Sequence, residues 1–214
     1  MMEHFTNAGN AGIVLLIIEA ITKNKTYLSE IDGKIGDGDH GINMSKGFSM
    51  AGEQISAGQS FSDAMKTLGD VLLFNIGGSM GPIYGTFFRT ASKSLKGKTE
   101  ITAELFSAML DNILQDIQSI GGAKPGDKTL IDTLEPAAYA FKKENNSGKT
   151  FGESMALAVI AAKEGRDSTI DMVARIGRSA RLGERSRGVL DAGAASCYII
   201  LETMFNAASA ALKE

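Results

Sequence analysis

The feature that most constrains the fold is the regular alternation of two kinds of connection between helical segments. Most long stretches of the 214-residue chain repeat apolar residues every three or four positions, the period of an α-helix with one buried face. Clean strand alternation is scarce, and β-branched runs such as residues 99–102 are short. We therefore expect an all-α protein, an antiparallel up-and-down barrel or bundle of about eight helices.

The connections predict where a site lies, because antiparallel neighbours place every second connection at the same end of a bundle. Plain polar linkers cover residues 57–60, 96–99 and 145–149, and glycine-rich loops cover residues 36–41, 77–82, 121–129 and 177–193. The two kinds alternate along the chain, so the four glycine-rich loops should meet at one end. A helix added or lost between Ala162 and Ile176 would break this pattern for the fourth loop.

Bulk composition excludes several classes of protein. Hydrophobic residues make up 43% and charged residues 22%, and the net charge of −3 gives no electrostatic basis for binding nucleic acid or an anionic membrane. The single cysteine, Cys197, allows no intrachain disulfide and fits a reducing compartment. The apolar run over residues 13–18 is too short to span a bilayer, and no basic segment precedes it. We expect one cytoplasmic domain, residues 1–214, without a nucleic-acid or membrane partner.

The first glycine-rich loop carries a cluster of carboxylates. Asp37 and Asp39 lie two residues apart, and Asp32 lies about one turn upstream. Crowded carboxylates repel one another unless a cation lies between them, and oxygen ligands favour Mg²⁺, Mn²⁺ or Ca²⁺ over zinc. An EF-hand is excluded, because the twelfth position counted from Asp37 is Phe48 rather than glutamate. The simpler alternative is an Asp-Gly turn in which Asp39 or His40 caps the next helix.

The second and third loops have compositions that suit a phosphate group. Residues 77–82 read Gly-Gly-Ser-Met-Gly-Pro and would present free backbone N–H groups, or else form only a tight turn between closely packed helices. Residues 121–129 resemble a Walker A loop, but Asp127 stands where the lysine should be, and we expect no strand before it. Lys128 can still reach a phosphate or metal-bound water. The alternative is a solvated lysine on a long loop.

The fourth loop concentrates positive charge. It holds four arginines in the ten residues from Arg178 to Arg187, and guanidinium groups suit phosphate oxygens or stack on adenine. Asp191 follows, where it can cap the last helix or hydrogen-bond a ribose. A run of charges is otherwise typical of a solvated surface. Each loop alone is a weak signal, whereas four loops at one end of a bundle predict a binding site.

Four motifs in this order resemble the nucleotide-binding L subunits of dihydroxyacetone kinase over nearly the whole chain. The motifs are D-x4-DGDHG-x-N-M, GGSMGP-x-YG, GDKT-x-x-D-x-x-x-PA and GR-x-x-x-LGERS-x-G-x-x-D-x-GA. The resemblance implies an eight-helix antiparallel barrel that holds an adenine nucleotide with bound Mg²⁺ at one end. This position agrees with the alternation of the loops, which does not depend on the family.

The resemblance also implies site residues. It makes Asp32, Asp37 and Asp39 the ligands of two Mg²⁺ ions, and it assigns no catalytic residue to this chain. The implied nucleotide-binding residues are His40, Gly41, Ile42, Asn43, Ser79, Met80, Gly121, Leu130, Arg178, Asp191, Ala192 and Gly193. Two of these depart from the family pattern, which often has a small hydroxyl residue in place of Met80 and proline in place of Ala192.

The function implied by the resemblance is phosphoryl transfer in a phosphoenolpyruvate-dependent system. ADP would stay tightly bound, a phosphohistidine protein of the phosphotransferase system would rephosphorylate it, and a separate K subunit would hold dihydroxyacetone. This chain offers little to hold the substrate, since His4 falls in a terminus expected to be mobile and His40 lies beside the metal ligands. Two alternatives stay open: a component of an ATP-dependent triose or tetrose keto-sugar kinase, and a regulatory nucleotide-binding module. The oligomeric state also stays open, a homodimer included.

Overall fold

The computed structural model describes residues 3–213, which form nine α-helices, two short 3-10 helices and two three-residue strands. In chain order the elements are β1 (His4–Thr6), α1 (Ala11–Lys23), α2 (Lys25–Ile35), α3 (His40–Gly52), α4 (Phe61–Asn75), α5 (Met80–Leu95), β2 (Glu100–Thr102), α6 (Ala103–Gly121), α7 (Ile131–Asn146), α8 (Phe151–Ser168), η1 (Thr169–Asp171), η2 (Ser179–Ser186) and α9 (Ala192–Ala210). Among these residues no helix is long and apolar enough to cross a membrane.

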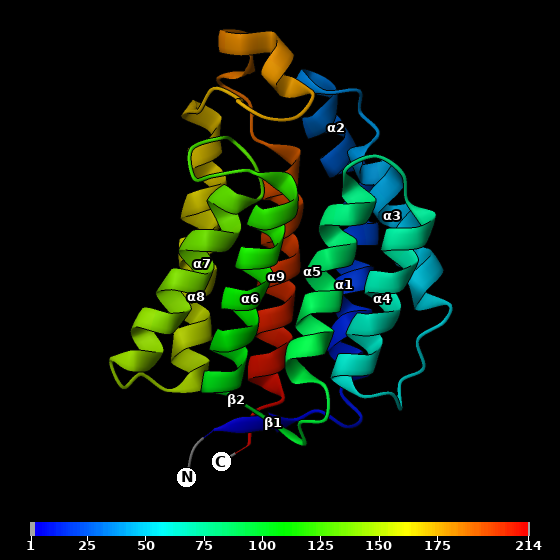
Figure 1. Ribbon diagram of the computed structural model, residues 1–214, viewed down its shortest axis with the longest axis vertical. Helices are drawn as coiled ribbons and strands as arrows, with labels where there is room; N and C mark the ends of the chain where they lie inside the picture. Colours follow the sequence, from blue (N-terminus) through cyan, green and yellow to red (C-terminus); the bar gives the residue numbers. More distant parts are fainter. Residues whose placement is uncertain (1–2, 214) are drawn as a thin grey trace.

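The helices form a closed ring of antiparallel arms (Figure 1). Each helix packs beside the next one along the chain, and α9 returns to pack against α1. Only Asn24 separates α1 from α2, and both pack on α3, so together they form one arm and the nine helices make eight arms. The expectation of an all-α, up-and-down barrel of about eight helices is confirmed.

The four glycine-rich loops lie at one end of the barrel and the plain linkers lie at the other (Figure 1). The doubtful stretch between Ala162 and Ile176 preserves this arrangement. There α8 continues to Ser168 and is followed only by the short helices η1 and η2, so no additional arm intervenes before α9. The alternation read from the sequence therefore gave the correct end for every loop.

The end opposite the glycine-rich loops is closed by aromatic side chains. Phe5 of β1 is fully buried, and its ring centroid lies 5.6 Å from that of Phe61 and 6.2 Å from that of Phe151. Phe106, Phe141 and Phe205 extend the same cluster. Contacts between aromatic rings, edge-to-face between Phe5 and Phe61 and tilted between Phe5 and Phe151, add to the hydrophobic free energy of burial. The cluster joins α4, α6, α7, α8 and α9 at this end.

Two expectations about this end were wrong. Residues 99–102 looked too short for a strand, yet residues 100–102 form β2, which pairs antiparallel with β1. His4 was expected in a mobile terminus, but it lies in β1, opposite Thr102, and forms a bridge with Lys213. The buried side chain of Phe5 explains both findings, because it anchors a strand that has no strong strand pattern of its own.

Local side-chain contacts fix where several arms begin at this end. A capping box begins α8: Glu153 N donates to Thr150 Oγ1 at 3.2 Å, and Thr150 N donates to Glu153 Oε2 at 2.9 Å. Ser60 caps α4 by accepting from Asp63 N at 3.0 Å. These contacts fix the first residues of α4 and α8 at the linker end. Each of these two helices then runs to the other end of the barrel, where a glycine-rich loop follows it.

Candidate nucleotide and metal site

A cavity of about 850 Å³ opens among the four glycine-rich loops, and every one of these loops contributes to its wall. The predicted site residues that line it are Asp32, Asp37, Asp39, His40, Asn43, Ser79, Met80, Gly121, Leu130, Arg178, Asp191, Ala192 and Gly193. Of the predicted residues only Gly41 and Ile42 lie outside this lining. A volume of this size suits a ligand as large as a nucleotide.

Three carboxylates on one side of the cavity could hold a cation. Asp32, Asp37 and Asp39 each offer one oxygen, and these oxygens lie within 4.8 Å of one another. Asp39 occupies the N-cap position of α3, but its side chain makes no capping hydrogen bond. The simple turn-and-cap alternative therefore does not explain this side chain. An all-oxygen cluster fits the preference of Mg²⁺ for hard ligands.

Arg178 from the fourth loop reaches across to these carboxylates. Its guanidinium group forms an ion pair with Asp37, and its Nη1 lies 3.6 Å from Asp39 Oδ2. The Arg178 side chain is 58% exposed, so its position depends on the loop that carries it rather than on burial. One arginine therefore links the first and fourth loops at the mouth of the cavity.

Glycines allow the close helix contacts that shape the first two loops. A Cβ atom at Gly41 would collide with the carbonyl oxygen of Lys25 and lie 2.8 Å from Ser29 N, so the start of α3 packs directly on α2. A Cβ at Gly81 would collide with the carbonyl oxygen of Ile76. Residues 77–82 therefore do form the tight turn between closely packed helices that the sequence offered as the alternative. Ile42, next to Gly41, is 51% exposed.

A buried polar network lies beneath three of the loops. His40 Nε2 and Ser196 Oγ are 2.8 Å apart, Ser196 Oγ lies 2.6 Å from Tyr84 Oη, and Tyr84 Oη donates to the Gly193 carbonyl at 3.2 Å. Burial lowers the pKa of His40 to about 4, so its imidazole is neutral near pH 7. Sequence reasoning missed Tyr84 and Ser196 as site residues, although Tyr84 stands inside the GGSMGP-x-YG motif.

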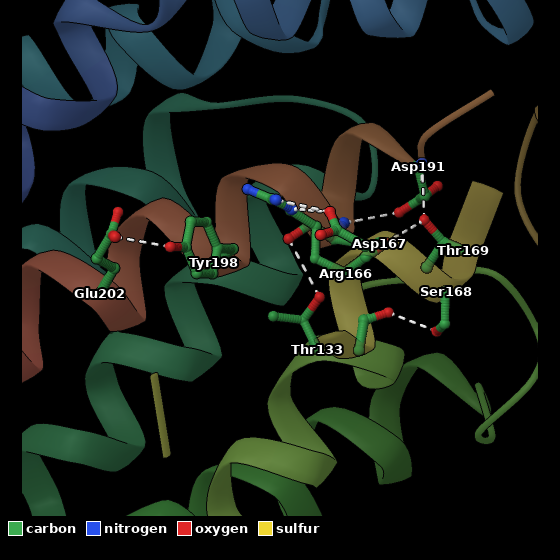
Figure 2. Close-up of polar contacts among 10 residues, drawn as sticks. Thr133, Arg166, Asp167, Ser168, Thr169, Asp191, Tyr198 and Glu202 are labelled. Atoms are coloured by element: carbon green, nitrogen blue, oxygen red, sulfur yellow. Dashed lines mark hydrogen bonds and ion pairs between the residues drawn. The ribbon is translucent and has the colours of Figure 1, made fainter. Parts of the chain in front are cut away.

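Asp191 is the N-cap residue of α9 and makes hydrogen bonds through both its side chain and its backbone (Figure 2). Its Oδ2 accepts from Ala194 N at 2.7 Å, and its backbone N donates to Thr169 Oγ1 at 3.1 Å. Burial raises the pKa of Asp191 to about 6, partly offset by the hydrogen bond from Ala194 N and by the charge of Lys128. Of the two roles predicted for Asp191, the structure shows the helix cap, and it places the side chain in the cavity wall.

Lys128 differs from both expectations for it. It is 1% exposed, so the solvated-lysine alternative is wrong. Its Nζ donates to the main-chain carbonyls of Thr169, Met172 and Val189, which leaves no N–H for a phosphate. Burial lowers the pKa of Lys128, and the nearby Asp191 opposes that change. Lys128 is among the residues that line the cavity, but its ammonium group is used to hold the loops together.

The side of the ring opposite the carboxylates is apolar. The loop between α6 and α7 lies across the barrel from the loop between α2 and α3 (Figure 1). Ile117, Ile120 and Leu130 line the cavity there together with Gly121. The cavity thus pairs an acidic, arginine-bridged side with an apolar side, an arrangement that suits a phosphorylated molecule with a flat ring.

Residues 34–206 match the family described as the DAK2 domain. The chain therefore belongs to the DAK2 domain family. It is 36% identical over 188 residues to the ADP-binding subunit DhaL of PEP-dependent dihydroxyacetone kinase 2 of Listeria innocua, covering 86% of this chain and 87% of that one. It is 35% identical over 184 residues to the corresponding DhaL subunit of Escherichia coli, covering 85% and 88%. Both matches run over most of the two chains compared.

The fold matches a solved structure as well. The dihydroxyacetone kinase of C. freundii, solved in complex with AMP-PNP and Mg²⁺, superimposes with a TM-score of 0.68 at 23% sequence identity. The match covers 96% of this chain and 35% of that longer chain. At this identity the comparison supports the helical barrel itself.

Proposed function

We propose that this chain is the ADP-binding subunit of a phosphoenolpyruvate-dependent dihydroxyacetone kinase. In this proposal a phosphohistidine protein of the phosphotransferase system rephosphorylates the bound ADP, and the resulting ATP gives its phosphoryl group to dihydroxyacetone on a separate K subunit. The observation that carries the proposal is the meeting of all four glycine-rich loops at one cavity with a carboxylate side and an apolar side. The names of the L. innocua and E. coli relatives support it.

The carboxylate side would hold the metal and the phosphates. Asp32, Asp37 and Asp39 would hold two Mg²⁺ ions, which when bound neutralise phosphate charge and orient the phosphoryl group. His40 to Asn43 would lie against the same phosphates. Arg178 would exchange part of its contact with Asp37 for phosphate oxygens. The chain's own contribution to the transfer is then positioning and charge balance.

The remaining loops would hold the rest of the nucleotide. Ser79 and Met80 stand at the start of α5, where backbone N–H groups are unpaired by the helix and can face a phosphate. Met80 has no hydroxyl to donate, so we assign this contact to the backbone. Gly121 and Leu130 would contact the base. The turn from Asp191 to Gly193 would face the sugar, and Ala192, although not proline, is buried in the first turn of α9.

Native mass spectrometry of the purified protein tests the bound state. We expect ADP and Mg²⁺ to be retained through purification. Reconstitution with a dihydroxyacetone-binding K subunit should then give product with phosphoenolpyruvate and the phosphohistidine protein, and little with ATP as sole donor. An empty site with turnover from ATP would favour the ATP-dependent keto-sugar kinase instead. Nucleotide binding without transfer in any partner combination would favour a regulatory module.

A further inference from the structure

The loop that carries Arg178 arches over the cavity between η1 and α9, at the top of Figure 1. Residues 172–190 form this arch, which we call the arginine loop. Its two limbs come together where Gly188 N donates to the Ile170 carbonyl at 2.7 Å and Asp191 N donates to Thr169 Oγ1 at 3.1 Å. We call this meeting point the neck.

Lys128 lies in the neck although it comes from a different loop. Its Nζ donates to Val189 O at 2.6 Å on the returning limb, to Met172 O at 3.3 Å on the outgoing limb, and to Thr169 O just before that limb. An ammonium group has three N–H donors, and three carbonyls accept them. One side chain thus joins both limbs of the arginine loop to the loop before α7.

The backbone at Lys128 supports a specific role for its side chain. Its φ of 63° is left-handed, and Lys128 is the one non-glycine residue with positive φ among residues 3–213. Glycine adopts this conformation without steric cost, whereas a lysine does not. Such a conformation persists when surrounding contacts determine it. Here those contacts are made by the buried ammonium and by the Asp132 carboxylate, which accepts from Gly126 N and Thr129 N.

Hydrogen bonds between residues of the arginine loop also join its two limbs. Ala174 N donates to Ser186 Oγ at 2.9 Å, and Ser186 Oγ donates to Gly183 O at 2.7 Å, so the two limbs are joined above the neck as well. A change at the neck should therefore move the loop as a unit and carry Arg178 with it. Since Arg178 is largely exposed, the loop is what holds its guanidinium group beside Asp37.

We propose that Lys128 is a positioning residue, whose buried ammonium closes the neck of the arginine loop and thereby holds Arg178 at the carboxylates of the cavity. The link to nucleotide binding rests on the function proposed above, whereas the closing of the neck does not. Carboxylates at Asp191, Asp171 and Asp132 lie near enough to interact electrostatically with the ammonium and to offset the cost of burying its charge.

The test compares Lys128→Met with Lys124→Met. The second variant is the control, because Lys124 is an exposed lysine of the same loop. Limited trypsin digestion without nucleotide, with fragments identified by mass, reports on the arginine loop directly. We expect Lys128→Met to be cleaved after Arg181 and Arg185 at least about tenfold faster than wild type and Lys124→Met, because three carbonyls lose their donor and the neck opens. Equal cleavage rates would overturn the proposal.

A second arm of the test connects the neck to Arg178. We expect Lys128→Met to weaken ADP binding about tenfold and Arg178→Ala to weaken it similarly, with the double variant little worse than either single one. Additive losses would show that Lys128 does not act through Arg178. If wild type binds no ADP, the proposed function fails while the cleavage rates still decide the role of Lys128.

Lys128→Gly guards against a folding defect in the methionine variant. Glycine relieves the left-handed backbone strain and also removes the ammonium, so a purely conformational role predicts cleavage as slow as in wild type. The proposal predicts fast cleavage in Lys128→Gly as well. Unchanged helical circular dichroism in this variant would confirm that the barrel remains folded.

Discussion

The two ends of the barrel differ in the side chains that form them: one is apolar and the other is charged. The linker end is closed by phenylalanine rings around the fully buried Phe5 and by a small two-stranded sheet. The loop end is open and carries the crowded carboxylates, Arg178 and the cavity. Close packing of apolar side chains stabilises the linker end, whereas the loop end gathers the charged groups that can bind a ligand. Substitutions at the loop end should therefore alter binding, and those at the linker end should alter folding.

The largest effect should follow from Asp37→Asn at the loop end. Since outer-shell changes at metal sites cost 10–100-fold, loss of a direct ligand should weaken retention of Mg²⁺–ADP about 1,000-fold, or about 4 kcal/mol. Isothermal titration and phosphoryl-transfer assays measure the loss, and helical circular dichroism should stay unchanged. Glu53→Gln, an exposed carboxylate beyond α3, is the matched control. Unchanged turnover in Asp37→Asn would remove Asp37 from the metal site.

The same substitution placed at each end sharpens the comparison. Phe5→Ala should lower the free energy of unfolding by about 3–4 kcal/mol, because it leaves a cavity among buried rings. Phe74→Ala at the loop end removes a side chain that is 75% exposed and should change stability by less than about 0.5 kcal/mol. Urea unfolding curves measure both. Similar losses for the two variants would contradict a division of labour between the ends.

Titration of Asp191 gives the loop end its own pH dependence. The pKa of Asp191 rises from 3.8 to about 6 on folding, so its contribution to stability is full below pH 3.8 and is lost as the pH rises through about 6. A shift of this size corresponds to about 3 kcal/mol, and we expect about 1–2 kcal/mol because the side chain borders the cavity.

Asp191→Asn isolates the contribution of Asp191 ionisation to stability, since asparagine still caps α9 but does not titrate. The free energy of unfolding of wild type, measured relative to that of Asp191→Asn, should fall by about 1–2 kcal/mol between pH 4 and pH 7. Other titrating groups, His40 among them, contribute to both proteins and cancel in the difference. A difference that stays constant with pH would mean that Asp191 keeps an ordinary pKa in the folded protein.

The smallest effect concerns a helix start at the linker end. Thr150→Ala removes one half of the capping box of α8 and should cost about 1 kcal/mol of stability, with ADP affinity unchanged. Ser56→Ala, an exposed residue at the same end, should cost less than about 0.5 kcal/mol. A measurable loss of ADP affinity in Thr150→Ala would show that the two ends are coupled.

The architecture and the place of the cavity were predictable because both follow from local patterns. Helical periodicity defines the arms, and antiparallel order assigns each loop to an end. The roles of the individual nucleotide and metal residues stay predictions, although the structure brings all but Gly41 and Ile42 into one cavity wall.

What the sequence did not reveal depends on contacts between distant residues. Lys128 is buried because its ammonium meets carbonyls 41, 44 and 61 residues further along the chain, and no local pattern marks that environment. The pairing of β1 with β2 joins residues almost a hundred positions apart through strands of only three residues. Asn24 divides the first arm in two without a glycine or proline at the break.

The bridge between His4 and Lys213 has a consequence for how the chain is connected. Since the two ends of the described chain meet beside the plain linkers, the path of the backbone is nearly circular. If the chain were joined near His4 and Lys213, it could be reopened at residues 57–60 or 145–149 with all four glycine-rich loops left uncut. Such a protein would begin with a different loop and would keep the same cyclic order of loops around the cavity.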